Sequence, residues 1–184
     1  MRSSDSHTAK VSTDLRVLID RIRAENKKDR ISKRETSRRL AKGFIDLLAA
    51  EGVKILETGM GNSNYFCAEI NGSPVAISPF GSHVEFWDKV SDGFRSLYLK
   101  RDCRWGVILF DLPKRRGIWL EGEDYDNQVL HDRELKKVSS HEVMKAERSG
   151  IAHSFIKCGE FVHLITHGPV TRPRAFLISK KGHA

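Results

Sequence analysis

The hydrophobic period of this chain changes at Gly52, and that change is the strongest constraint on its fold. Before Gly52 the apolar residues recur at intervals of three and four, which places them on one side of a helix. After Gly52 they alternate at intervals of two or form short continuous runs, which is typical of strands. The sequence therefore predicts an α+β fold in one domain over residues 12–184, with a helical part over 12–51 and a mostly β part over 52–184.

Two helices are expected in the helical part. In the first helix, four apolar residues lie along one face: Leu15, Leu18, Ile19 and Ile22. Their spacing predicts a helix over about residues 13–25. Ser32, followed three residues later by Glu35, has the pattern of a capping box, so a second helix is expected from there to about Ala50. Residues 1–11 are polar and lack periodicity, and we expect them to form a flexible arm.

Several short strands are expected after Gly52: residues 53–58, 65–70, 74–78, 105–112 and 118–121. Asn71-Gly72 predicts a tight hairpin between two of them, because both residues tolerate positive φ. Trp105–Leu112 is apolar on both faces, as a central buried strand would be. Helices are expected over about 88–100 and from a cap at Ser139 or Ser140 to about Ser149, while residues 161–165 and 175–178 fit either strand or helix. We expect two N-terminal helices packed on an antiparallel sheet of about five strands, with one or two inserted helices.

Positive charge is concentrated in one segment of the chain. The net charge is +8, and the segment from Arg21 to Lys42 holds ten basic and three acidic residues, or +7. Such a concentration favours a polyanionic partner. A membrane partner is not expected, because no apolar run approaches the roughly 20 residues that span a bilayer.

Phosphate contacts by Lys and Arg supply much of the affinity of proteins for nucleic acid. Candidate contact residues lie in the second helix, in the charged segment before it and in the turn 114–116: Lys27, Lys28, Arg30, Lys33, Arg34, Arg38, Arg39, Lys42, Lys114, Arg115 and Arg116. We therefore hypothesise a nucleic-acid-binding protein. Duplex DNA is favoured over RNA, because no RNA-recognition pattern is present.

An ordinary solvated helix face is the simpler interpretation of the same charges. Glu35 precedes Arg39 by four residues and Lys42 precedes Asp46 by four, so part of the charge can pair within the helix. An acidic protein partner would also suit a basic helix, and a homodimer stays open. None of these interpretations requires catalysis.

A metal-dependent endonuclease is a further alternative. Asp111, Glu121 and Glu123 superficially resemble the Asp…Glu-x-Lys arrangement of restriction-type endonucleases, with Glu123 in place of the Lys. Mg²⁺ would be the cofactor of this alternative, and otherwise no cofactor is expected. A tight turn would set Asp111 opposite about Ile118 and leave Glu121 about 10 Å further along the strand, too far to share one ion. Two earlier carboxylates are further candidates: Glu57 and Glu69.

The cysteines indicate a reducing compartment, and we expect a cytoplasmic protein. There are three of them, widely spaced and without a Cys-x-x-Cys pair: Cys67, Cys103 and Cys158. Cys158, His163 and His167, with His153 upstream, have a C-x4-H-x3-H spacing that zinc ligands could use. The spacing is not that of a standard zinc finger, and surface histidines beside a buried Cys are the simpler interpretation.

Overall fold

The computed structural model describes residues 13–59, 64–82, 85–87, 91–126 and 137–168. The helices are α1 (Leu15–Asp29), α2 (Lys33–Ala50), α3 (Asp92–Arg101), α4 (Gly122–Asp124), α5 (Ser140–Arg148) and α6 (Cys158–His167). The strands are β1 (Lys54–Gly59), β2 (Tyr65–Ile70), β3 (Ser73–Ser82), β4 (Glu85–Trp87), β5 (Arg104–Asp111), β6 (Arg116–Glu121), β7 (Lys137–Ser139) and β8 (Ala152–Phe155). The expected arm 1–11 and the run 175–178 lie outside the described residues.

The fold is α+β, as the sequence predicts, but its main sheet differs from the expected one. Six strands pair in the order β1-β2-β3-β5-β6-β8, and β4 pairs with β7 in a separate two-stranded sheet. All neighbours in the main sheet are antiparallel except β3 and β5, which run parallel. The sheet thus has one strand more than expected and is mixed, because α3 carries the chain across from β3 to β5 in the manner that a parallel pair requires.

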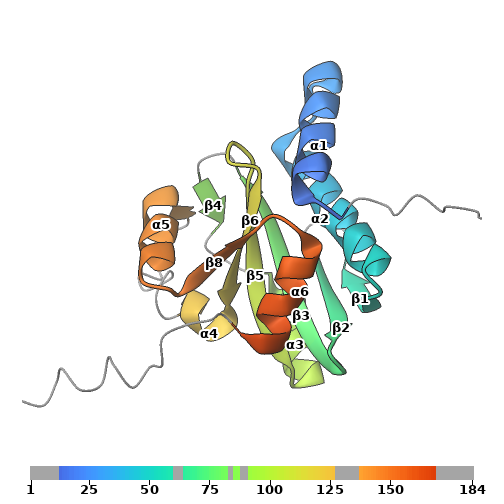
Figure 1. Ribbon diagram of the computed structural model, residues 1–184, viewed down its shortest axis with the longest axis vertical. Coiled ribbons are helices and arrows are strands. Elements are labelled where there is room, and N and C mark those ends of the chain that lie inside the picture. The colour runs from blue at the N-terminus through green and yellow to red at the C-terminus, as the bar shows by residue number, and fades with distance from the viewer. Residues whose placement is uncertain (1–12, 60–63, 83–84, 88–90, 127–136, 169–184) are drawn as a thin grey trace, which may run out of the picture.

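Helices cover both faces of the six-stranded sheet. Two hydrophobic cores take alternate residues of the same strand: Ile108 and Phe110 belong to one, and Val107 and Leu109 to the other. The first core also receives side chains from α1, α2 and α6, and the second from α3 and α5. Figure 1 shows α4 and α5 on one side of the sheet and α1 and α2 on the other. The predicted central strand, buried on both faces, is therefore confirmed.

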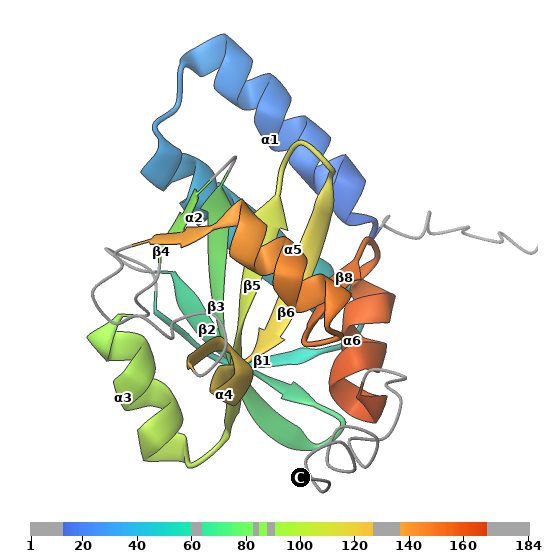
Figure 2. The ribbon, with the colours of Figure 1, turned by 90° about the vertical axis from the view of Figure 1, so that its left-hand side faces the viewer.

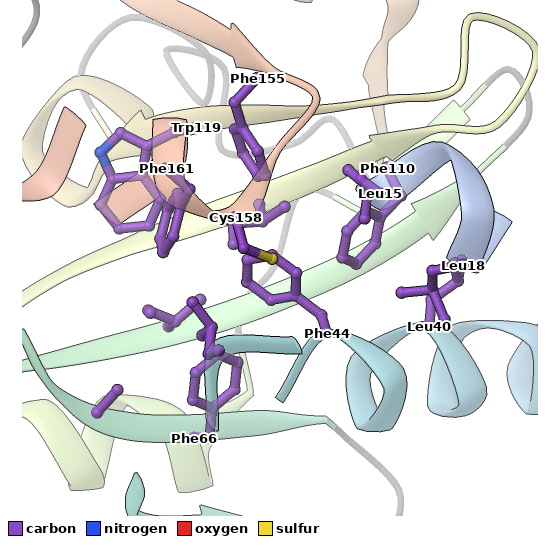
Figure 3. Close-up of a cluster of buried hydrophobic side chains, with 14 of the residues drawn as sticks. Leu15, Leu18, Leu40, Phe44, Phe66, Phe110, Trp119, Phe155, Cys158 and Phe161 are labelled. Atoms are coloured by element: carbon purple, nitrogen blue, oxygen red, sulfur yellow. The ribbon is translucent and has the colours of Figure 1, made fainter. Parts of the chain in front are cut away.

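Phe44 of α2 occupies the centre of the first core (Figure 3). Its ring lies 5.4–6.4 Å, centroid to centroid, from the rings of four other residues: Phe66, Phe110, Phe155 and Phe161. These residues come from β2, β5, β8 and α6. One side chain of α2 therefore joins the N-terminal helices to three strands of the main sheet and to α6.

The two tight connections of the sheet differ in how well the sequence predicts them. Asn71 and Gly72 both have positive φ, 52° and 77°, and form the expected hairpin between β2 and β3. The β5–β6 turn is shorter than expected, because only residues 112–115 lie in it and Asp111 pairs with Arg116. The predicted register, with Asp111 opposite Ile118, is therefore wrong; Ile118 pairs with Leu109.

The start of α1 is fastened to the start of α6. The Leu15 amide donates to the Ile156 carbonyl at 2.8 Å, and the Cys158 amide donates to the Thr13 carbonyl at 3.1 Å. Asp14 and Lys157 form an isolated antiparallel bridge between these bonds. Among the described residues, no helix is long and apolar enough to cross a membrane.

Candidate nucleic-acid interface

The corner between α1 and α2 projects from the sheet. The buried residues of α1 all lie in its first half, from Leu15 to Ile22, and its second half has none. Figure 2 shows the connection between the two helices at the top of the molecule, clear of the six-stranded sheet. The end of α1 and the beginning of α2 are therefore open to a partner.

Hydrogen bonds within the corner hold its shape. Arg30 ends α1 in the left-handed conformation, with φ of 49°, and its amide donates to the Asn26 carbonyl. Ser32 then caps α2 by accepting from the Glu35 amide at 3.1 Å, as the capping-box pattern predicts. The Asn26 side-chain amide donates to the Thr36 hydroxyl at 2.9 Å, which joins the two helices. The cations of the corner are thus displayed from a fixed backbone.

Four exposed cations of the corner have no ion pair with any carboxylate that the structure describes: Lys27, Lys28, Arg30 and Lys33. Lys27 and Lys28 lie in the last turn of α1, where the negative end of the helix dipole favours them. Lys33 begins α2, whose N-terminal end adds partial positive charge. These four residues define what we call the basic corner.

Other predicted contact residues of α2 are engaged within the protein. Arg38 donates twice to Glu35, at 2.7 and 2.8 Å. Arg39 bonds Glu35 at 3.1 Å and reaches Glu25 of α1 at 2.9 Å, so it links the helices. Hydrogen bonds from Arg38 and then Arg39 lower the pKa of the Glu35 carboxyl to about 2.

The expected pairing within α2 is therefore half right. Glu35 and Arg39 form an ion pair, whereas Lys42, exposed on the same helix, forms none with Asp46. Arg34 is exposed and has an interaction within the chain. Of the α2 cations beyond the corner, Lys42 alone has no ion pair or other interaction with the described residues.

The three cations at the β5–β6 turn differ in their exposure and in their partners. Lys114 is exposed, and Arg115 forms an ion pair with Asp20 of α1 at 2.8 Å. Arg116 points inward, with 17% of its side chain exposed, and bonds Asp111 of β5 and Glu147 of α5. Its bidentate bonds to Glu147, at 2.8 and 2.9 Å, fasten α5 to the sheet. The geometry therefore gives Arg116 a structural role.

The Arg115–Asp20 pair places the turn beside α1. Asp20, Arg23 and Lys27 share one side of α1, because they are spaced three and four residues apart. The turn and the basic corner therefore lie toward the same end of the molecule, beside α1 (Figure 2). Sequence reasoning missed Asp20, since a pair between residues 95 positions apart leaves no periodic signal.

The candidate catalytic carboxylates are not brought together. Asp111 pairs with Arg116 at one end of the β5–β6 hairpin, whereas Glu121 pairs with Gly106, five positions away or about 16 Å. Glu121 accepts hydrogen bonds from Arg104 and from the Trp119 indole, and Glu123 is exposed.

The two earlier carboxylates lie on the strands at the far edge of the sheet. Glu57 of β1 is bonded to Arg101 at 2.9 Å, and Glu69 of β2 is exposed opposite Lys54. Within the described part of the chain, no three His, Cys, Asp or Glu residues are grouped so that they could hold a metal ion. The structure thus offers no described site for the Mg²⁺ of the endonuclease alternative.

The predicted zinc ligands lie on different sides of α6. Cys158 is fully buried in the first core, where burial raises the pKa of its thiol to about 12. His163 and His167 are exposed, with ring centroids 4.5 Å apart. His153 lies on β8, and burial lowers its pKa. The structure therefore keeps the two α6 histidines together and separates them from Cys158.

Comparisons of the chain with protein families, with curated proteins and with solved structures find no match. The fold and the basic corner alone thus define the class of protein: an α+β protein with a mixed sheet and a cationic helical corner.

Proposed function

We propose that this protein binds nucleic acid, with duplex DNA as the preferred form, through the basic corner. The observation that carries the proposal is the presence of four exposed cations without described ion pairs within residues 27–33. Phosphate neutralisation releases condensed counterions, and cations already paired with carboxylates contribute less to it. The corner is therefore the part of the predicted surface best suited to a phosphate backbone.

The β5–β6 turn enlarges this surface. Lys114 is exposed beside α1, and the exposed Arg115–Asp20 pair can open, because such pairs contribute at most about 1 kcal/mol. Four corner cations with one or two from the turn predict a slope of about −4.5 to −5.4 in a plot of log affinity against log salt.

Backbone contact is favoured over base stacking. Single-strand binders stack bases on exposed aromatic side chains. Here Trp105 stacks on Tyr98 at 4.5 Å and Trp119 is buried. No aromatic residue is among the exposed large hydrophobic side chains that the structure describes. A regular double helix, recognised through its phosphates, therefore suits the surface better than a single strand.

The test is fluorescence anisotropy with labelled duplex DNA, single-stranded DNA and duplex RNA over a range of salt. Lys27→Glu with Arg30→Glu reverses two corner charges, and we expect binding to weaken by about 30-fold with a shallower salt slope. Lys54→Glu with Lys100→Glu makes the same charge change at exposed positions on β1 and α3, and we expect less than about threefold weakening. Equal losses in the two double variants would contradict the proposal.

Two further arms separate the alternatives. Polyglutamate should compete poorly with duplex DNA at equal charge, whereas equal competition would favour an acidic protein partner. Duplex recovered after incubation with Mg²⁺ should be intact. Nicks that disappear in Asp111→Ala would instead favour the endonuclease alternative.

A further inference from the structure

His163 and His167 form a pair of imidazoles on the outer side of α6. They are one helical turn apart, both are exposed, and their ring centroids lie 4.5 Å from each other at an interplanar angle of 48°. Neither residue belongs to the basic corner, and the pair is independent of the proposed nucleic-acid binding. Two adjacent exposed imidazoles on a regular helix are a ready source of metal ligands.

The arrangement follows from how α6 packs. Its buried residues are Cys158, Phe161 and Ile165, which recur at intervals of three and four and face the first core. At 100° per residue, His163 and His167 lie on the opposite side of the helix. The helix therefore presents the two imidazoles together to solvent, and its packing into the core prevents it from turning them inward.

The spacing suits chelation by one ion. Two histidines four residues apart on one helical face bind zinc in helical metalloprotease sites. His167 is also in the last turn of α6, where the negative end of the helix dipole favours a cation. Arg104, a nearby positive charge, donates to the Ile165 carbonyl and to the Glu121 carboxylate, which offsets its charge.

The acidic residue nearest along this face has another partner. Glu160 precedes His163 by three residues, but one of its carboxylate oxygens accepts from the Ile156 amide at 2.9 Å as part of the helix cap. Among the described residues, no third His, Cys, Asp or Glu is grouped with the pair so as to hold a metal ion. The protein therefore supplies two nitrogen ligands, and water would complete the coordination shell.

We propose that His163 and His167 chelate one divalent transition-metal ion of the kind that imidazole prefers, namely Cu²⁺, Ni²⁺ or Zn²⁺. Imidazole nitrogen suits these ions, whereas Mg²⁺ and Ca²⁺ prefer oxygen ligands. The buried Cys158 takes no part. The site is bidentate, with one ion for each chain.

The test is calorimetric titration of the untagged full chain with NiCl₂. We expect one site per chain, and we expect His163→Ala and His167→Ala each to weaken it by tenfold or more. The double variant should bind no more weakly than either single variant, because one lost ligand already abolishes the chelate. His141→Ala removes an exposed histidine from α5 and should change the affinity by less than twofold.

Thermal unfolding supplies a second measurement. Ni²⁺ should raise the Tm of the wild type and of His141→Ala but not of the α6 variants, because only a ligand of the folded state stabilises it. If His163→Ala and His167→Ala each weakened Ni²⁺ binding only slightly, and the two losses of affinity added up in the double variant, the histidines would bind independently and the proposal would be overturned. One Ni²⁺ per two chains would overturn it as well, since the ion would then be shared between copies.

Discussion

Arg115 Nη2 lies 2.8 Å from Asp20 Oδ2 and so joins the β5–β6 turn to the middle of α1. Both side chains are about half exposed, at 43% and 51%, so water competes for the pair and its net contribution to stability is small. A carboxylate in this position occupies the guanidinium in the way that a phosphate would. Asp20 is therefore expected to compete with a bound backbone for Arg115.

Removing that competition should strengthen binding. We expect Asp20→Asn to raise the affinity for duplex DNA by about threefold, because the substitution frees Arg115 and removes a negative charge beside the proposed interface. Asp46→Asn makes the same charge change at an exposed position of α2 with no described ion pair, and its effect should be smaller. Anisotropy titrations at one salt concentration measure both, and equal effects would exclude a specific role for Asp20.

The Glu35 carboxyl should make stability depend on pH in the acid range. Hydrogen bonds from Arg38 and Arg39 lower its pKa from 4.5 to about 2. A group whose pKa is depressed by folding stabilises the protein fully above the unfolded value and loses that contribution as pH falls through the folded value. The free energy of unfolding should therefore decrease between pH 4.5 and about 2.

Two measurements check this expectation. Carbon-detected NMR should give a low pKa for Glu35 in the wild type and a higher one in Arg38→Gln, because the main hydrogen bond is then lost. Urea unfolding of Glu35→Gln should show a weaker dependence on acid pH than the wild type. An unchanged pKa in Arg38→Gln would show that the ion pair is not formed in solution.

Phe44 should be among the most sensitive positions for stability. Its ring is fully buried among four aromatic neighbours, and truncation to Ala would leave a cavity that these elements cannot readily fill. We expect Phe44→Ala to lower the free energy of unfolding by about 3–5 kcal/mol and Phe44→Leu by roughly 1 kcal/mol. Val17→Ala, at a side chain that is 57% exposed, should change it by less than about 0.5 kcal/mol. Urea unfolding measures all three.

Two glycine substitutions should change the stability of the fold in opposite directions. A Cβ at Gly106 in β5 would lie 2.5 Å from the Leu120 carbonyl oxygen and against the Trp119 ring, so Gly106→Ala should destabilise the fold by about 1–3 kcal/mol. A Cβ at Gly159 in α6 would meet no atom within 4 Å, and Gly159→Ala should stabilise by up to about 1 kcal/mol through helix propensity. Thermal unfolding of both variants under one condition gives the comparison, and a stable Gly106→Ala would disprove the close packing of β5 and β6.

Local patterns in the sequence predict the elements well where one face is apolar. The stripe from Leu15 to Ile22 is the buried side of α1, and Ser32 caps α2 as its spacing with Glu35 predicts. The strand over residues 65–70 is found with the predicted bounds. Charge was a poorer guide, because α1 continues through the charged residues to Asp29, beyond the expected end at residue 25.

Pairing between distant segments was not predictable in the same way. The parallel pairing of β3 with β5 depends on where the chain re-enters the sheet after α3. The spacing of apolar residues within a segment does not indicate that position. The Arg115–Asp20 and Arg116–Glu147 pairs likewise join segments far apart in the chain. The proposed site was therefore predictable as a charged segment, whereas the separation of unpaired from paired cations required the three-dimensional arrangement.

The fastening of Thr13 and Leu15 to Ile156 and Cys158 also has a consequence for biosynthesis. Chains emerge from the ribosome from the N-terminus, so α1 is made long before the segment that secures its first turn. The helices can pack on each other and on the early strands, but the first core lacks Phe155, Cys158 and Phe161 until the last described elements have been made. During translation we therefore expect the beginning of this domain to keep part of its apolar surface exposed, the kind of surface that chaperones bind.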